Sequence, residues 1–441
     1  MKIIIVGAGI AGLSLAVALS QAGHSVTVLD SAAQLAELGA GVQMTPQAVK
    51  YFFQWGLKQD ILADAIIPQA IHVRDGTRGD LLGTVNVASM EAQYGAPYIV
   101  VHRAALHAIL HAHAVKAGAQ IKLASRVVKY DFDNGGCELQ DGKRLEADLV
   151  VAADGINSTA RAQLLGPLDP GSQPTGWAAF RMMTSVSKLR DDPVTADLAN
   201  LETGSSGLWI APNRSCMTYL VKEGTMLNVV LSHPDDVDTR NFSPQEYKKT
   251  VDDMFQDFEP RVQKIMSLAE PKIVNYPVYA VPPLPHWAHE SGRFTLIGDA
   301  AHAMAFYMSM GVSLAVEDAV SLTKALDLAA PPNTPLDSSR LKHALNVYQS
   351  VRKRRAEAVQ RASLHAGNSM HVADGQDRDF MLEALKHAHE DITWPPRESR
   401  EHSRVLQGVN GERLGPGGFT DKGTRDWCYG YDAIADIAAA Y

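Results

Sequence analysis

The chain opens with Lys2-Ile3-Ile4-Ile5-Val6-Gly7-Ala8-Gly9-Ile10-Ala11-Gly12, an apolar run followed by three spaced glycines. The run predicts a buried strand, and the helical periodicity of residues 13–22 predicts a helix directly after the glycines. A second apolar run over residues 26–29 ends at Asp30. The stretch therefore predicts a strand, turn, helix and strand, the unit that begins a doubly wound α/β sheet.

Each glycine of this turn has a physical role. Gly7 permits the tight turn, Gly9 lets the backbone approach a pyrophosphate, and Gly12 allows the helix to pack closely on the strand. Free amide groups at the start of the helix, around Ile10 and Ala11, would face the phosphates, and the Asp30 carboxylate would bind ribose hydroxyls. The alternative is a glycine turn in an α/β domain that binds no nucleotide.

Composition excludes several classes of protein. The chain has 441 residues, of which 46% are hydrophobic and 20% charged, values typical of a globular protein with more than one domain. Its 41 basic and 49 acidic residues leave a net charge of −8, which gives no reason to expect nucleic acid or an anionic membrane as partner. No apolar run reaches the roughly 18 residues of a membrane helix.

Three widely separated cysteines, Cys137, Cys216 and Cys428, have neither paired nor metal-type spacing. They argue against a disulfide scaffold and a metal site, and favour a reducing compartment. We therefore expect a cytoplasmic protein.

Further along the chain the periodicity changes. Residues 145–151 predict a strand, and residues 171–282 alternate with period two between glycine turns, which is typical of an antiparallel sheet. Helical patterning returns over residues 313–328 and 338–369. The last stretch, 370–441, is polar and rich in glycine.

Two more motifs lie where predicted strands end. Asp154-Gly155 follows one strand, and Gly298-Asp299-Ala300-Ala301-His302 follows another. Ligands bind at the carboxyl ends of the strands in such sheets. Each carboxylate would either accept hydrogen bonds from a ligand or cap the helix that follows. We expect His302 to be a buried structural residue.

These three motifs, in this order, resemble the fingerprints of the class A FAD-dependent monooxygenases, in particular the salicylate-hydroxylase-like branch of these aromatic hydroxylases. The similarity covers roughly residues 1–365. It includes the segments Glu37–Gln43, His102–Leu106, Asp148–Ser158 and Arg352–Ala356. The tail segment Trp427–Asp432 also resembles the C-terminus of that branch.

The resemblance implies an α/β fold with a Rossmann-like FAD-binding domain, an inserted antiparallel-sheet substrate domain, and a C-terminal helical segment and tail. We expect the FAD-binding domain to comprise residues 1–70, 98–170 and 283–365. Residues 71–97 and 171–282 would form the substrate domain, and 366–441 a C-terminal extension.

The resemblance also implies an activity. NADPH or NADH would reduce FAD, and a flavin C4a-hydroperoxide formed from O2 would transfer one oxygen atom to an aromatic or other electron-rich small molecule. Because no second glycine fingerprint follows a strand, the nicotinamide nucleotide would dock transiently between the domains. The residues that the resemblance places at FAD are Gly7, Gly9, Ile10, Ala11, Gly12, Asp30, Gly41, Val42, Gln43, Arg103, Val127, Asp154, Gly155, Asp299, Gly311 and Val312.

One departure from the family pattern concerns the loop before Gly311. Phe306 stands where the family usually has proline, and Met310 where it has glutamine. We expect Phe306 to alter the substrate pocket, and Phe306, Met308 and Met310 together to make it roomy and apolar.

Candidates for the substrate side lie in the predicted antiparallel sheet. Arg181 and Tyr219 could hold a phenolate or carboxylate, although Arg181 could equally brace the domain interface. Arg214 lies on a neighbouring strand position, and Trp209 is expected to be core. The proposed catalytic residues are thus Arg181, Tyr219 and Phe306.

Two other functions remain open from the sequence. A flavin-dependent halogenase or other oxidoreductase on the same fold is one, although no two tryptophans here have the Trp-x-Trp spacing of halogenases. A non-catalytic binding protein that kept the fold is the other, and the presence of both Asp154 and Asp299 argues against it. The protein would be a monomer or a homodimer.

Overall fold

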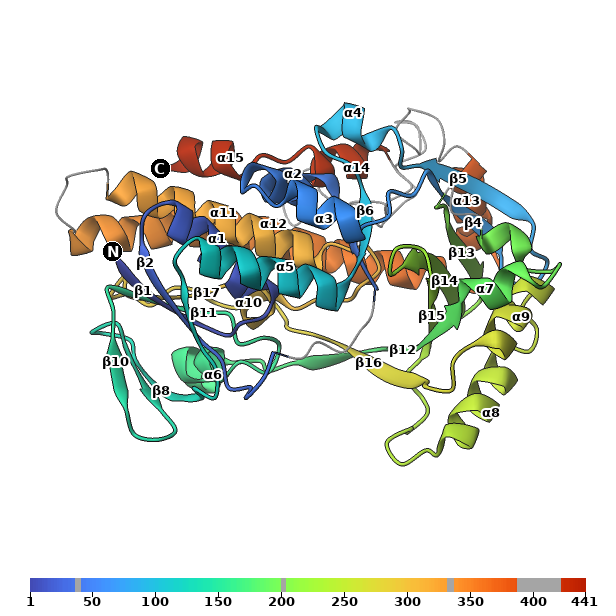
Figure 1. The fold of residues 1–441 in the computed structure, drawn as a ribbon, viewed down its shortest axis with the longest axis horizontal. Coiled ribbons are helices and arrows are strands. Elements are labelled where there is room, and N and C mark those ends of the chain that lie inside the picture. The colour runs from blue at the N-terminus through green and yellow to red at the C-terminus, as the bar shows by residue number, and fades with distance from the viewer. Residues whose placement is uncertain (36–40, 200–203, 331–336, 387–421) are drawn as a thin grey trace.

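A computed structural model describes residues 1–35, 41–199, 204–330, 337–386 and 422–441. The chain forms two lobes: a parallel sheet covered by helices lies at one end, and a larger, mainly antiparallel sheet lies at the other (Figure 1). The expected fold class is confirmed. The expected domain boundaries stay a prediction.

The parallel sheet has the strand order β17-β11-β1-β2-β7. Its central strand β1 is buried from Ile3 to Val6, and helix α1 follows directly after the glycine turn, as predicted. α1 packs between α5 and α11. The strands are β1 Lys2–Val6, β2 Ser25–Leu29, β7 Gln120–Lys122, β11 Leu149–Ala152 and β17 Phe294–Leu296.

The apolar stretch 145–151 is two strands, so the prediction of one continuous strand was wrong. β10 (Arg144–Glu146) pairs antiparallel with β9 (Gly136–Leu139), whereas β11 pairs parallel with β1. The chain changes sheets at Ala147 and Asp148, because the Ala147 amide donates to the Gly135 carbonyl and the Asp148 carboxylate accepts from the Lys2 amide. β8 (Val127–Asp131) completes this small sheet.

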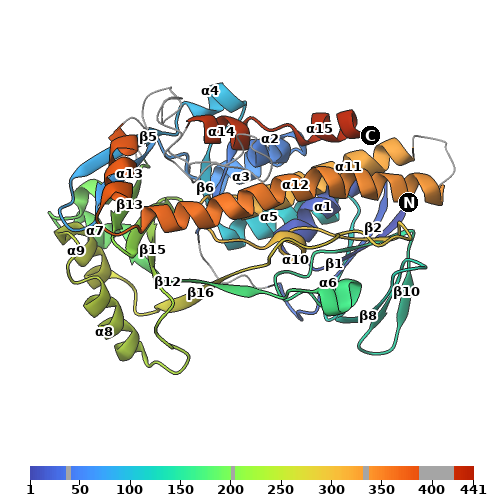
Figure 2. The same ribbon diagram turned by 180° about the vertical axis from the view of Figure 1, so that it is seen from behind.

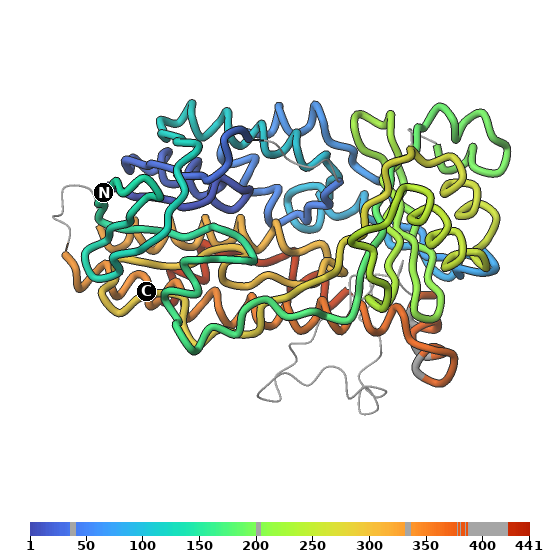
Figure 3. Tube along the Cα trace, turned by 90° about the horizontal axis from the view of Figure 1, so that it is seen from below, coloured from blue at the N-terminus to red at the C-terminus, as the bar shows by residue number. Residues whose placement is uncertain are grey.

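The second large sheet has the order β16-β12-β15-β14-β13-β4-β5. The predicted alternating stretches lie in β13 (Ser206–Ala211), β14 (Arg214–Val221) and β15 (Met226–Pro234). β12 (Gln173–Ser185) and β16 (Val274–Ala280) pair side by side and carry the chain between the lobes (Figure 3). β4 (Ala70–Asp75) and β5 (Leu81–Asn86) extend the other edge.

Two long helices pack against each other, and the longer one reaches from one lobe to the other (Figure 2). α11 (Gly311–Ala329) and α12 (Ser338–Met370) agree closely with the predicted helices, and α12 runs the length of the molecule to the large sheet (Figure 2). The remaining elements before them are β3 Gly41–Met44, α2 Pro46–Gln54, α3 Lys58–Asp64, α4 Met90–Tyr94, β6 Ile99–His102, α5 Arg103–Lys116, α6 Thr159–Leu165, α7 Val186–Arg190, α8 Pro244–Met254, α9 Pro260–Leu268 and α10 Asp299–His302, with 3-10 turns at Gly166–Leu168 and Ala196–Ala199.

The described part of the C-terminal extension is mostly helical, which its polar, glycine-rich composition does not indicate. It contains α13 (Gln376–Lys386), α14 (Lys422–Tyr429) and α15 (Ala433–Ala440), and α15 packs on α11 and α12. The glycines at 408–418 lie outside the described residues.

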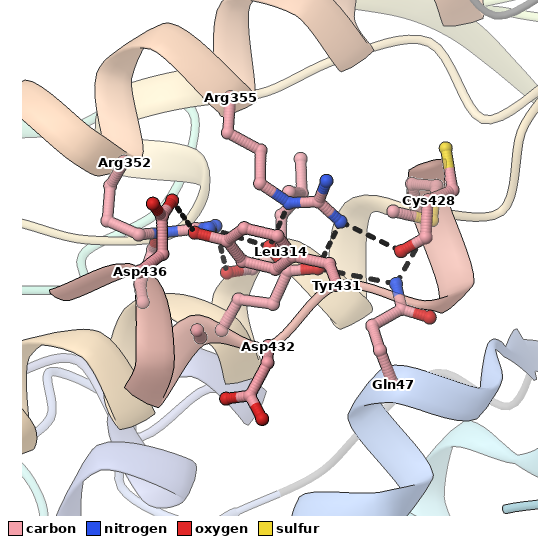
Figure 4. A network of polar contacts seen from close by, with 12 residues as sticks. Gln47, Leu314, Arg352, Arg355, Cys428, Tyr431, Asp432 and Asp436 are labelled. Carbon is pink, nitrogen blue, oxygen red and sulfur yellow. Dashed lines mark hydrogen bonds and ion pairs between the residues drawn. The ribbon is translucent and has the colours of Figure 1, made fainter. Parts of the chain in front are cut away.

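A buried charge network joins α11, α12 and this extension (Figure 4). The Arg352 guanidinium contacts Glu317 at 2.7 Å and Asp318 at 2.9 Å, and all three side chains are fully buried. Arg355 makes two bonds to the Glu317 carboxylate, at 2.7 and 2.8 Å. Its guanidinium also lies 3.7 Å from the Tyr431 ring centroid.

The same network reaches the start of α10. The Asp318 carboxylate accepts the Gly298 amide at 2.9 Å and lies 2.5 Å from Nε2 of His302, which confirms His302 as a buried structural residue. Burial alone would raise the pKa values of Glu317 and Asp318, but the adjacent Arg352, Arg355 and His302 keep both below their usual range. Both carboxylates are therefore ionised and paired.

Arg352→Met should destabilise the fold strongly, because it leaves two buried carboxylates short of a cation. We expect a loss of about 3–5 kcal/mol in the free energy of unfolding, measured by denaturant titration. The control is Arg354→Met, which removes an exposed arginine from the same helix and should cost little. A loss below about 1 kcal/mol for Arg352→Met would contradict the structural importance of the network.

Candidate active site

A cavity of about 370 Å³ lies between the parallel sheet and the large sheet. One end is lined by the glycine turn after β1 and by the start of α11. The other is lined by one face of the large sheet, by the loop 304–309, and by single residues of the C-terminal extension. The cavity is thus lined by residues of all three glycine and aspartate motifs, among them Gly9, Gly155 and Asp299.

The glycine turn is shaped to admit a ligand at one point and to pack tightly at the others. A Cβ on Gly7 would lie 2.3 Å from the Ala153 carbonyl oxygen, and a Cβ on Gly12 would lie 2.0 Å from the Gly7 carbonyl oxygen. A Cβ on Gly9 would meet no described heavy atom within 4 Å, and Gly9, Ile10 and Ala11 line the cavity. The open position is the one where a pyrophosphate would approach.

Asp30 holds the turn from the next strand. Its carboxylate accepts the Ala8 amide at 2.7 Å and the Ala32 amide at 2.8 Å. Asp30 lies outside the cavity, as does Val127, a buried residue at the start of β8.

The two motif carboxylates differ in what they contact. Asp154 accepts hydrogen bonds from the Ser158 hydroxyl at 2.5 Å and the Ala160 amide at 3.1 Å, so it supports the first turn of α6. Its neighbour Gly155 lines the cavity and Asp154 does not. Asp299, in contrast, lines the cavity, beside the N-terminal residues of α11, Gly311 and Val312.

A hydrogen-bonded cluster stands where β3 meets the loop 304–309. The side-chain oxygen of Gln43 accepts from the Tyr98 hydroxyl at 2.8 Å and from the Ser309 hydroxyl at 2.6 Å. Ser309 has φ +56°, a left-handed conformation that costs free energy in residues other than glycine. Gly41, Val42 and Arg103 line the same region, and residues 37–40 lie outside the described residues.

The floor of the cavity is one face of the large sheet. The cavity is lined by alternate residues of β14, namely Ser215, Met217 and Tyr219. Arg181 of β12 lies on the same face of the sheet. The Tyr219 hydroxyl donates to the Gly41 carbonyl at 2.9 Å, and burial raises its pKa to about 12. Arg181 Nε is a buried donor without a hydrogen-bond partner among the described residues.

Phe306 forms part of the cavity wall. The Arg181 guanidinium lies 5.8 Å from its ring centroid, and the Tyr307 ring is 4.6 Å away. Met308 also lines the cavity, but Met310 does not: it is buried, and its sulfur accepts from Thr45 and Gln47. The expectation that Met310 shapes the pocket was therefore wrong, because its side chain packs against α2.

Two other candidates lie away from the cavity. Trp209 is fully buried and donates to Glu259 at 2.6 Å, which confirms it as core. Arg214 pairs with Asp257 at 2.8 Å on the far side of the sheet.

Sequence reasoning missed several residues of the cavity. Ile71, Val85 and Val87 on the β4–β5 edge give it an apolar wall, and no motif marks them. Tyr98, Tyr307, Met370 and Tyr429 also contribute, the last two from the C-terminal end of the chain. Their only signal is aromatic or apolar character, which core residues share.

Within the described ranges, no helix has the length and apolar character needed to cross a membrane. The same ranges contain no group of three or more His, Cys, Asp or Glu side chains arranged to hold a metal ion.

Comparison with known proteins agrees with this arrangement. The family described as FAD binding domain matches residues 1–363. An FAD-dependent monooxygenase, OpS4 from Beauveria bassiana (strain ARSEF 2860), is 30% identical over 99% of this chain and 96% of its own. A 3-hydroxybenzoate 6-hydroxylase from Aquipseudomonas alcaligenes is 31% identical over 85% of this chain and 90% of its own. The crystal structure of FqzB has a TM-score of 0.73 and 29% identity, covering 85% of this chain and 86% of that one.

The two motif carboxylates should respond differently to removal. Asp299→Ala takes a charged acceptor from the cavity wall and should weaken FAD binding by about 1.5–3 kcal/mol. Asp154→Ala removes the support of the first turn of α6 and should lower the unfolding free energy by about 1 kcal/mol, with a smaller effect on FAD. FAD fluorescence titration and thermal unfolding measure the two. Equal FAD dissociation constants for wild type and Asp299→Ala would reduce Asp299 to a helix residue.

Proposed function

Because the chain belongs to the FAD binding domain family and is an FAD-dependent monooxygenase, we propose that the cavity between its two sheets holds the flavin at one end and an aromatic substrate at the other. The single observation that carries this proposal is the continuity of the cavity. It runs from the open position at Gly9, past Asp299, to Arg181 and Phe306. The relatives give no support to a halogenase or to a non-catalytic binding protein.

The residues at the first end fit FAD. The space above Gly9, the amides of Ile10 and Ala11, and the positive N-terminus of α1 suit a pyrophosphate. Asp299 offers a carboxylate to the ribityl hydroxyls. The N-terminus of α11 at Gly311 would favour negative charge on the pyrimidine edge of the flavin. When bound, FAD takes a hydride from NADH or NADPH and supplies the oxygen chemistry.

Residues at the second end would position the substrate. Arg181 Nε, a buried donor with no hydrogen-bond partner in the described part of the chain, would bind an oxygen of the substrate. Phe306, fixed between Arg181 and Tyr307, would stack on the ring. Tyr219 is held by the Gly41 carbonyl, so it would fix the sheet against β3 and stay protonated at neutral pH. Enclosure between the sheets would exclude water.

The proposal also covers the substrates, the location and assembly of the protein, and the binding of the adenosine half of FAD and of the nicotinamide nucleotide. The chain takes a small-molecule substrate and O2. We propose that it acts in the cytoplasm as a monomer or homodimer, that Asp30 and Val127 border the adenosine half of FAD, and that the nicotinamide nucleotide docks transiently between the domains.

Gly9→Val should abolish FAD retention while leaving the fold intact. The branched side chain would occupy the open space that the pyrophosphate needs, and its Cβ would meet no described heavy atom within 4 Å. The contrasting variant is Gly12→Ala, whose Cβ would clash with the Gly7 carbonyl and should lower the melting temperature. Flavin absorbance near roughly 450 nm, a property of the cofactor, reports retention. Stoichiometric FAD in purified Gly9→Val protein would overturn the assignment.

Phe306→Pro tests the substrate end. A panel of phenols and related aromatic compounds first identifies a substrate that stimulates NAD(P)H oxidation by the wild type. Removing the ring should keep FAD bound and uncouple NAD(P)H oxidation from product, because the stacked orientation of the substrate is lost. Phe306→Leu, which keeps an apolar side chain without imposing proline's φ, controls for loop distortion. A stable, flavin-loaded Phe306→Pro protein with unchanged product and coupling would refute the role of the ring.

A further inference from the structure

Ser215 lies on the substrate side of the cavity with a histidine directly behind it. Its hydroxyl oxygen is 2.8 Å from Nε2 of His371, the residue that directly follows α12. Ser215 lines the cavity, whereas His371 is outside it and only 2% exposed. The two residues are far apart in sequence, so their meeting depends on how the end of α12 docks on the large sheet.

His371 is fixed from several directions. The Asn213 amide donates to its backbone carbonyl at 2.9 Å, which ties the end of α12 to the turn between β13 and β14. Its ring lies 4.3 Å from the Trp177 ring centroid and 5.5 Å from that of Tyr307. Such packing leaves the imidazole a defined orientation toward Ser215.

The pair is neutral. Burial lowers the pKa of His371 to about 4, so the imidazole carries one ring proton at neutral pH. Nε2 either donates to the serine oxygen or accepts the serine proton, according to the tautomer. When Nε2 donates, the Ser215 hydroxyl can donate toward the cavity. When Nε2 accepts the serine proton, the Ser215 oxygen can accept a hydrogen bond from a group in the cavity. A partner that both donates and accepts matches this pair better than a carboxylate, which only accepts when ionised.

The cavity wall around Ser215 is largely apolar, and a second serine lies opposite it on the neighbouring strand. Met217 is next on the same face of β14, and Met370 comes from the end of α12, so much of the nearby wall is apolar. The cross-strand partner Ser232 also lines the cavity, but its hydroxyl contacts the Tyr307 hydroxyl at 3.4 Å and has no histidine behind it. Ser232 therefore provides a matched control on the neighbouring strand.

We propose that Ser215, oriented by His371, is the residue that hydrogen-bonds a hydroxyl group on the aromatic substrate. The proposal rests on the proposed function, which places the aromatic substrate in this cavity. Ser215 contacts the substrate, and His371 is a positioning residue that acts through it. Arg181, a permanent cation on the same face of the sheet, would take any second, more acidic oxygen of the substrate.

The test compares two probes, 2-naphthol and naphthalene, which lacks the hydroxyl group. Each is titrated into the full-length, FAD-loaded enzyme, and binding is followed by the change in flavin absorbance. The wild type should prefer 2-naphthol by about tenfold, which corresponds to about 1.4 kcal/mol. Ser215→Ala should lose this preference, and Ser232→Ala should keep it.

Variants of His371 separate positioning from packing. His371→Phe keeps a ring between Trp177 and Tyr307 but removes the hydrogen bond, and it should lose most of the preference. His371→Gln places an amide near the former Nε2 position and should restore part of it. Melting temperatures are measured for each variant, so that the ratio of the two probe dissociation constants is compared only among folded, flavin-loaded proteins.

The outcomes distinguish this inference from the proposed function. If the wild type binds both probes and Ser215→Ala keeps a tenfold preference for 2-naphthol, the hydroxyl site is overturned while the aromatic site stands. Equal ratios in His371→Phe and wild type would overturn the role of His371. If neither probe perturbs the flavin of the wild type, the aromatic substrate site itself is refuted, and the hydroxyl site with it.

Discussion

The paired burial of Glu317 and Asp318 with Arg352 is the constraint on which the rest of the site depends. Two ionised carboxylates inside a protein are very costly unless cations and hydrogen bonds compensate them. Both carboxylates lie on α11, and their charged partners come from α10 and α12. Arg355 also donates to the Cys428 carbonyl of the C-terminal segment, so satisfying these charges fixes four elements relative to one another. The pairing is also directional, because a planar guanidinium donates its hydrogen bonds to a carboxylate in only a few orientations.

This network positions part of the cavity wall. Asp318 bonds to the Gly298 amide and to His302, so it holds both ends of the short helix that begins with Asp299. Glu317 and Asp318 belong to α11, whose first residues border the same cavity. A charge cluster outside the cavity thereby sets where a carboxylate and a helix N-terminus stand within it. Specificity of arrangement, more than net stability, is what such a cluster contributes.

The sequence predicted the parts of the molecule whose signals are local. The glycine turn could be predicted because strand, turn and helix occupy one short stretch, and Gly7 and Gly12 each have a steric reason. The period-two strands of the large sheet and the helices α11 and α12 were visible for the same reason. Residues 145–151 were predicted wrongly, because the strand is broken by hydrogen bonds of Ala147 and Asp148 to Gly135 and Lys2, which sequence periodicity does not show.

The rest of the site depends on contacts between distant segments. The position of Met310 in the loop predicted a pocket residue. Its sulfur instead accepts hydrogen bonds from Thr45 and Gln47 at the start of α2. Ser215 and His371 are ordinary residues at unremarkable positions, and only the docking of α12 joins them. The C-terminal helices α14 and α15 also contact distant segments, because Arg355 donates to the carbonyls of Trp427 and Cys428 and α15 packs on α11 and α12.

The place of the C-terminal segment has a consequence for how the protein is made. Arg355 donates to the carbonyls of Trp427 and Cys428, and Tyr429 forms part of the cavity wall. A ribosome delivers these residues after the nucleotide-binding turn and both sheets have left it. Until then Arg355 lacks those two carbonyl partners and the cavity wall lacks Tyr429. The nascent chain can thus form its N-terminal turn early, but this part of the cavity wall forms only after residues 427–429 have been delivered.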